Sequence, residues 1–144
     1  MTVMQRTPWR MSRAHSCLPA LTEFVSPYAT TMGMRREGAR VVMAYNAGLS
    51  GRPGFLHGGA ISGLLENTAW LAVLAALPDG ARLKPITVTV DFMRGAVADT
   101  ETYAEAEIVR LGRRVANVFV TAWQGDRTKP IATANLKMMI ERAD

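Results

Sequence analysis

A histidine, two glycines and an acid stand at positions that suit chemistry on a carbonyl group. His57, Gly58 and Gly59 open a run of mostly small or apolar residues that extends to Leu77, and Glu66 lies partway along it. Apolar surroundings disfavour the charged form of a carboxylate, so placing one there is costly. We therefore expect Glu66 to be buried and to be a stronger base than a carboxylate in water.

The two glycines indicate where a carbonyl oxygen would bind. The first N–H groups of a helix have no partner within the helix and carry the positive end of its dipole. Because Gly58 and Gly59 have no Cβ, their backbone can approach a ligand closely. Such a site stabilises an oxygen that gains negative charge while its carbon is attacked. Attack by water at this carbonyl would need these parts and no metal.

The rest of the chain supplies the elements that position these residues. Residues 1–27 look irregular, with a short helix expected over 16–24. A glycine-rich loop over 47–56 precedes the long helix, which ends at residues 78–80. After the helix the hydrophobic period changes from helical to twofold, which indicates strands. The expected strands cover residues 28–36, 39–46, 86–93, 101–111, 114–124 and 130–140.

One buried helix and a series of antiparallel strands predict an α+β fold, a curved antiparallel β-sheet wrapped around a long central helix. The length of 144 residues suits one domain, expected over 28–144 after an N-terminal extension over 1–27. The run 58–77 approaches the ~20 residues that cross a bilayer. Glu66 and Asn67 at its centre favour a buried core helix instead, so we expect no membrane partner.

Composition and charge narrow the function classes. The formal net charge of +5 favours anionic partners. Nucleic acid is disfavoured, because the chain has no helix-turn-helix, zinc spacing or aromatic–basic strand pattern. A metal site is also disfavoured, since the two histidines and one cysteine lack ligand spacing. Cys17 has no second cysteine to pair with, which indicates a reducing, cytoplasmic location.

Several motifs carry a resemblance to a known family. His57-Gly58-Gly59 is followed by Glu66, nine residues after the histidine, and further motifs are Val88-Thr-Val-Asp-Phe-Met-Arg-Gly-Ala, Leu111-Gly-Arg-Arg and Ile131-Ala132. From about Tyr28 to Ile140 the chain resembles the hot-dog fold acyl-CoA thioesterases, in the group related to the phenylacetate-pathway and 4-hydroxybenzoyl-CoA thioesterases. The resemblance implies a hot-dog fold and hydrolysis of an acyl-CoA thioester to free acid and coenzyme A (CoA).

The resemblance also implies a role for each residue of the first motif. Glu66 would be the nucleophile or the general base, the Gly58 N–H would polarise the thioester carbonyl, and His57 would help to order the loop. Two positions depart from the family pattern. Gly51 stands where many members have Asn or Gln, six residues before the histidine, and Pro85 stands where some have Ser or Thr.

Substrate binding is expected to involve the basic residues as well. Arg94, Arg113 and Arg114 match regions where relatives hold the nucleotide and pantetheine of CoA; alternatively, they are solvated strand ends. CoA is part of the substrate, so no separate cofactor is expected. Asn67 either packs, bonds within a dimer or holds the reacting water. The expected substrate-binding residues are Gly59, Asn67, Phe92, Met93, Arg94, Gly112, Arg113 and Arg114.

A distance argument then predicts the assembly. Glu66 lies eight residues beyond Gly58, about 12 Å along a helix that rises ~1.5 Å per residue. The reacting carbon must lie ~3 Å from both groups. Gly58 of one chain would therefore work with Glu66 of another, in an antiparallel helix pair at the centre of a twofold dimer. The resemblance implies the same dimer, often paired into a tetramer.

The sequence favours a thioesterase but leaves alternatives. A hot-dog protein that binds acyl-CoA or another hydrophobic ligand without hydrolysing it is the main one, and the missing amide at Gly51 gives it room. Met, Ala and Leu on the second half of the helix suggest an apolar or aromatic acyl pocket, while Trp70 is expected in the core. The acyl group, the choice between nucleophile and base, and dimer or tetramer stay open.

Overall fold

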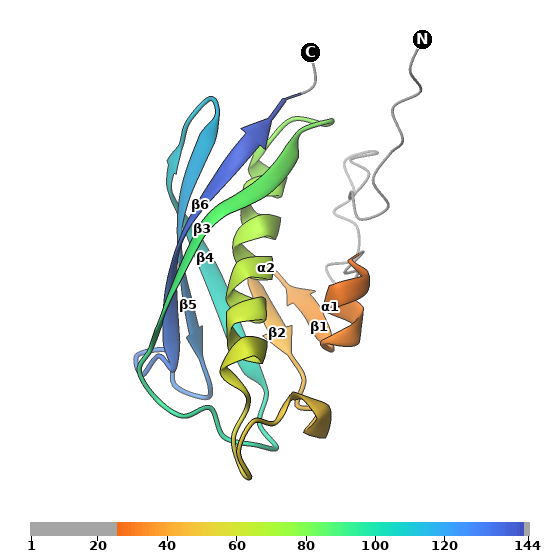
Figure 1. Cartoon of the computed structure of the whole chain (residues 1–144), viewed down its shortest axis with the longest axis vertical. Helices are drawn as coiled ribbons and strands as arrows, with labels where there is room; N and C mark the ends of the chain where they lie inside the picture. The colour runs from red at the N-terminus through yellow and green to blue at the C-terminus, as the bar shows by residue number, and fades with distance from the viewer. Residues whose placement is uncertain (1–25, 143–144) are drawn as a thin grey trace.

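The computed structural model of the chain describes residues 26–142 as one sheet with a long helix against it (Figure 1). The helix expected over residues 16–24, and nearly all of the expected extension 1–27, lie outside the described residues. The elements in chain order are α1 (Pro27–Thr31), β1 (Met34–Glu37), β2 (Arg40–Met43), η1 (Ala47–Leu49), α2 (Gly58–Ala76), β3 (Arg82–Phe92), β4 (Thr102–Leu111), β5 (Val115–Trp123) and β6 (Ala132–Glu141).

The strands form a single six-stranded sheet in the order β1-β2-β4-β5-β6-β3, and every neighbouring pair is antiparallel. α2 lies along one face of this sheet, and α1 lies on the same side of the sheet as α2, where Tyr28 contacts Gly63 (Figure 1). The contacts of α2 are mainly with β4, β5 and β6. The predicted α+β fold, a curved antiparallel sheet around one long helix, is confirmed.

Alternating and small side chains let the helix lie close to the sheet. Along β5 the buried positions alternate with partly exposed ones, as in a strand with one face on the core. The buried side chains of β5 include Ala116 and Ala122, which leave space for larger residues of the helix. The fully buried residues of α2 are Leu64, Leu65, Ala69 and Val73.

α2 itself is buried on one side only, which corrects the expectation of a fully buried helix. Gly59 and Glu66 are exposed, and Gly63 and Trp70 are partly exposed. A count of apolar residues along a run does not tell which face of the helix they occupy. By length and apolar composition α2 would be able to cross a membrane, but its buried face packs on the sheet as a core helix does.

The first expected strand, residues 28–36, is wrong in its first half. Ser26 is the N-cap of α1 and Pro27 stands at its start, so the chain makes a helical turn there. Gly33, with φ of +67°, follows the helix, and β1 begins at Met34. The cap and the proline outweigh the strand preference of the tyrosine and threonines in this segment.

β3 begins at Arg82, four residues before the expected start at 86. Its register against β6 shifts between Pro85 and Thr87. Proline has no N–H to donate and is accepted in edge strands and at bulges. β3 is the edge strand, and within residues 26–142 no strand pairs with its other side. An 11-residue edge is thus left open.

Candidate active site

The N-terminus of α2 leaves one backbone donor without a partner. His57 is the N-cap, and its Nδ1 accepts a hydrogen bond from the Gly59 N–H at 2.8 Å. The N–H groups of Ala60 and Ile61 both donate to the His57 carbonyl, at 2.9 and 3.3 Å. No residue in the described part of the chain accepts a hydrogen bond from the Gly58 N–H. This donor is therefore available to a ligand.

A side chain on either glycine would be crowded by its surroundings. A Cβ on Gly59 would lie 2.9 Å from Nδ1 of His57, so a side chain there would disturb the cap. A Cβ on Gly58 would lie 3.2 Å from Cζ of Phe92, whose ring covers this turn. The His57 backbone is fixed in turn, because its N–H donates to the Leu49 carbonyl at 2.8 Å.

The Gly58 N–H lies beside a pocket of about 580 Å³, which we name the Gly58 pocket. Five residues expected from the sequence line it together: His57, Gly58, Phe92, Met93 and Arg94. Arg52 and Phe55 are among the lining residues that sequence reasoning missed. The Arg52 guanidinium lies 4.1 Å from the centre of the Phe55 ring, and this stacking holds a cation near the Gly58 turn.

Gly51 also lines the Gly58 pocket, at the position where the resembling family often has an amide. Its N–H donates to the Phe55 carbonyl at 3.1 Å, which closes the turn. A Cβ on Gly51 would lie 3.1 Å from Cα of His57, so the turn packs tightly against the cap. The pocket thus contains no side-chain amide at this place.

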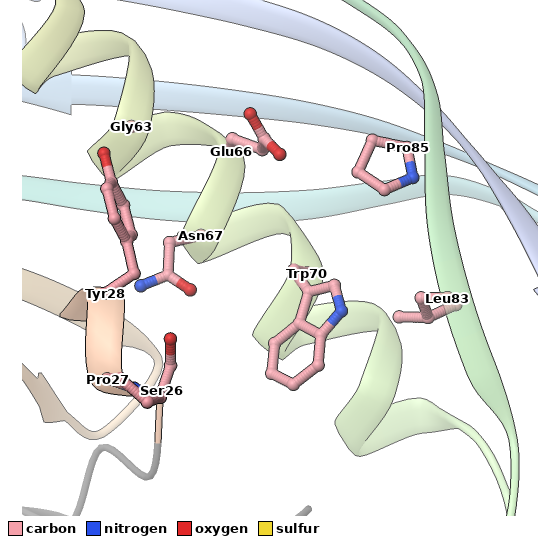
Figure 2. Close-up of a pocket in the computed structure, with 9 residues that line it drawn as sticks. All are labelled: Ser26, Pro27, Tyr28, Gly63, Glu66, Asn67, Trp70, Leu83 and Pro85. Atoms are coloured by element: carbon pink, nitrogen blue, oxygen red, sulfur yellow. The ribbon is translucent and has the colours of Figure 1, made fainter. Parts of the chain in front are cut away.

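Glu66 lies in a different pocket of about 700 Å³, the Glu66 pocket (Figure 2). The Glu66 side chain is exposed, so the expectation that it is buried is wrong. The reason is local: Gly63 and Asn67, its neighbours on that face, are small or polar and do not cover it. Figure 2 shows the carboxylate directed toward Pro85 of β3.

Asn67 and Trp70 also line the Glu66 pocket. Asn67 is only 9% exposed, and its Nδ2 donates to Sδ of Met34 at 3.1 Å, a weak acceptor. The amide is therefore anchored to β1 rather than free to turn. Trp70, expected in the core, is partly exposed; it packs against the core and forms part of the pocket wall.

Gly112 and Arg113 lie in a third pocket of about 450 Å³, the Arg113 pocket. Arg110, Asn117 and Lys137, which the sequence did not single out, line it as well. Arg114 does not line this pocket; its carbonyl accepts a hydrogen bond from the Ile140 N–H at 2.7 Å. The structure therefore keeps the predicted residues in three groups within one chain. Arg110 on β4 and Lys137 on β6 both pair with Asn117 on β5, so the register of the sheet, which the sequence does not give, brings these residues together.

Comparison with known proteins agrees with this architecture. The sequence model of the Thioesterase superfamily matches residues 53–131, more than half of the chain. No curated protein gives a significant match. Among solved structures, the chain is similar to a phenylacetic acid degradation-related protein from Ralstonia eutropha, with 27% identity, 79% of this chain and 90% of that chain covered, and a TM-score of 0.71.

Two further structures share the fold at lower identity. A protein from Bacillus halodurans, whose crystal structure contains CoA, is 18% identical over 82% of this chain and 78% of that chain, with a TM-score of 0.74. A thioesterase from Haemophilus influenzae is 18% identical over 94% and 96%, with a TM-score of 0.78. The resemblance seen in the sequence is confirmed: this chain belongs to the thioesterase superfamily, and thioester hydrolysis is the general reaction that its membership supports.

Proposed function

We propose that the protein hydrolyses acyl-CoA thioesters to a free acid and CoA. In this proposal Glu66 acts on a carbonyl that the Gly58 N–H of a second copy polarises. One observation carries it: the Gly58 N–H is free while Glu66 lies in another pocket of the same chain. Eight residues of helix separate them by about 12 Å, too far for one reacting carbon.

The open edge of β3 supports a second copy as the missing part. Ile86, Val88 and Phe92 on this strand are 57%, 37% and 56% exposed. Long apolar edges are prone to pair with another chain, and a twofold axis would pair β3 with its copy. The Glu66 carboxylate is directed toward this strand (Figure 2), so a partner joined there would help to enclose it.

The charges favour CoA as the leaving group. Arg94 and Arg52 line the Gly58 pocket, and Arg110, Arg113 and Lys137 line the Arg113 pocket. Guanidinium groups bind phosphate with short, charge-assisted hydrogen bonds. The similar Bacillus halodurans protein holds CoA in its crystal structure, which agrees with such a ligand.

Two routes for the chemistry fit this geometry. In the first, the Glu66 carboxylate takes a proton from water while the water oxygen attacks the thioester carbon. In the second, the carboxylate attacks directly, and water then hydrolyses the acyl–carboxylate anhydride. In both, the Gly58 N–H stabilises the oxyanion, the C–S bond breaks, and CoA leaves with a proton.

Replacement of the carboxylate tests the proposal. Glu66→Gln keeps the shape but removes the base and the nucleophile, so we expect kcat to fall by about 10²- to 10⁴-fold. The measurement is release of free thiol from a panel of CoA esters, with circular dichroism as a control of folding. Hydrolysis by the Gln variant at the parental rate would rule out Glu66.

Binding of acyl-CoA without hydrolysis is a second candidate, and Gly51 is the observation that favours it. The pocket lacks the side-chain amide that many relatives have at this place. Without that donor, one hydrogen bond that could orient the thioester is missing. Tight binding of CoA esters with no thiol release by the parent protein would favour this candidate.

A further inference from the structure

The Glu66 pocket is a groove with distinct walls. Its floor is one face of α2, because Gly63, Glu66, Asn67 and Trp70 are spaced by three or four residues and lie on the same side of a helix. Leu83 and Pro85 of β3 close the groove at one end of this floor, and Ser26, Pro27 and Tyr28 at the start of α1 close it at the opposite end (Figure 2).

Tyr28 is fitted to this floor. Its ring stands beside α2 with the hydroxyl directed toward Gly63 (Figure 2). A Cβ on Gly63 would collide with the Tyr28 hydroxyl oxygen and lie 3.0 Å from its Cζ. The ring therefore depends on the missing side chain at Gly63, one turn before Glu66. It stays 48% exposed, so part of it faces the groove.

The helix that carries Tyr28 is anchored in the core. Ala29 is fully buried and Met32 is 8% exposed. The Met32 N–H donates to the Tyr28 carbonyl at 2.9 Å, and Ser26 caps the first turn. Tyr28 is thus held by a fixed backbone, although its side chain lies at the surface.

The three pockets differ in charge. The Gly58 pocket and the Arg113 pocket both contain arginine, whereas no lysine or arginine lines the Glu66 pocket. Its apolar lining consists of Pro27, Leu83, Pro85 and the rings of Tyr28 and Trp70. The phosphates of a CoA ester would bind where the cations are, which leaves this groove for the uncharged acyl group.

We propose that Tyr28 is a specificity-determining residue that closes the α1 end of the acyl groove and limits the length of the acyl chain. This inference rests on the proposed function, since it needs an acyl group at Glu66. The role is steric, because the hydroxyl makes no hydrogen bond to any residue within 26–142. Burial, and then the nearby Glu66 charge, raise the pKa of Tyr28, so the ring stays neutral beside an apolar chain.

The test compares Tyr28→Ala with Tyr28→Phe and with Thr31→Ala, an exposed position on α1 outside the groove. The readout is kcat/KM for CoA esters from butyryl to dodecanoyl. We expect Tyr28→Ala to move the preference to longer chains, by about fourfold for each additional methylene that becomes buried. Tyr28→Phe and Thr31→Ala should keep the parental profile. Parallel profiles for the Ala and parent proteins, or a shifted profile for Phe, would overturn the proposal.

A second measurement separates this proposal from the proposed function. In the Glu66→Gln background, affinities for the same CoA esters are measured by calorimetry with and without Tyr28→Ala. A gain in affinity for the longer chains supports the role of Tyr28 even if the parent releases no thiol. If Tyr28→Ala leaves the dependence of affinity on chain length unchanged, or if affinity does not depend on chain length in either protein, the role of Tyr28 is contradicted. The proposed function fails separately, when Glu66→Gln hydrolyses the esters at the parental rate.

Discussion

At the start of α2, three adjacent residues meet three different requirements. His57 turns its Nδ1 back onto the Gly59 N–H and so caps the helix. Gly59 leaves room for that cap, and Gly58 keeps a free N–H under the ring of Phe92. The cap thus satisfies the Gly59 N–H and leaves the Gly58 N–H without a partner among residues 26–142. The two glycines of the motif therefore have different structural roles.

Removal of the cap should cost stability. In His57→Ala the Gly59 N–H loses its acceptor, and loss of an N-cap lowers the free energy of unfolding by about 1 kcal/mol. His57→Asn keeps an acceptor of similar reach and should stay close to the parent. Urea denaturation followed by circular dichroism measures both variants. Equal stability of the Ala variant and the parent would show that the cap contributes nothing.

The same residues show what a sequence can and cannot reveal about a site. The type and spacing of His57, Gly58 and Glu66 sufficed to predict a donor at the helix start and an acid along the helix. Whether Glu66 is buried could not be predicted, because this depends on the face of α2 that the residue occupies and on the elements that pack against that face. Tyr28 was missed because it lies 38 residues before Glu66 in the chain, and only the fold brings it to the groove.

Among the elements, those with a strong periodic pattern were predicted well. The helix and the strands after it followed from the change of period, and β4, β5 and β6 agree with their expected ranges within a few residues. α1 was predicted as strand from the strand preference of its tyrosine and threonines. In so short a helix, of five residues, the N-cap and the proline outweigh that preference. The start of β3 was missed because Pro85 interrupts the alternation.

A charge on the open edge of β3 should prevent assembly. Val88 pairs with the buried Leu136 and so faces the same side as α2, whereas Thr89 pairs with the exposed Asn135 on the other face. We expect Val88→Lys to be monomeric and at least about tenfold less active, since a desolvated lysine would oppose the pairing. Thr89→Lys is the matched control and should keep the parental mass. Sedimentation velocity checks both. A dimeric, fully active Val88→Lys would exclude this edge as the interface.

At the scale of the whole molecule, the two groups proposed for catalysis lie in separate pockets of one chain. The Gly58 pocket contains the free Gly58 N–H and two arginines, and the Glu66 pocket contains the carboxylate and no lysine or arginine. A twofold dimer would join each half to its complement and form two equivalent sites. Length and composition indicated one domain, but only its three-dimensional structure shows that Gly58 and Glu66 line different pockets.

Mixing two inactive variants tests this division most directly. Gly58→Pro removes the N–H while keeping a residue that suits the first helical position, and His57 already has the extended φ of −69° and ψ of 138° that precede proline well. Gly58→Ala, which adds the same Cβ but keeps the N–H, is its control. Glu66→Gln removes the carboxylate. Each variant alone should be nearly inactive in both of its sites.

When the two variants are unfolded together and refolded as a mixture, half of the dimers should be mixed. Each mixed dimer has one site with an intact Gly58 N–H and an intact Glu66. Thiol release should then recover to about a quarter of the parental rate per chain. If the mixture is no more active than the sum of the separate variants, Gly58 and Glu66 do not meet across a subunit interface, and the composite site is wrong.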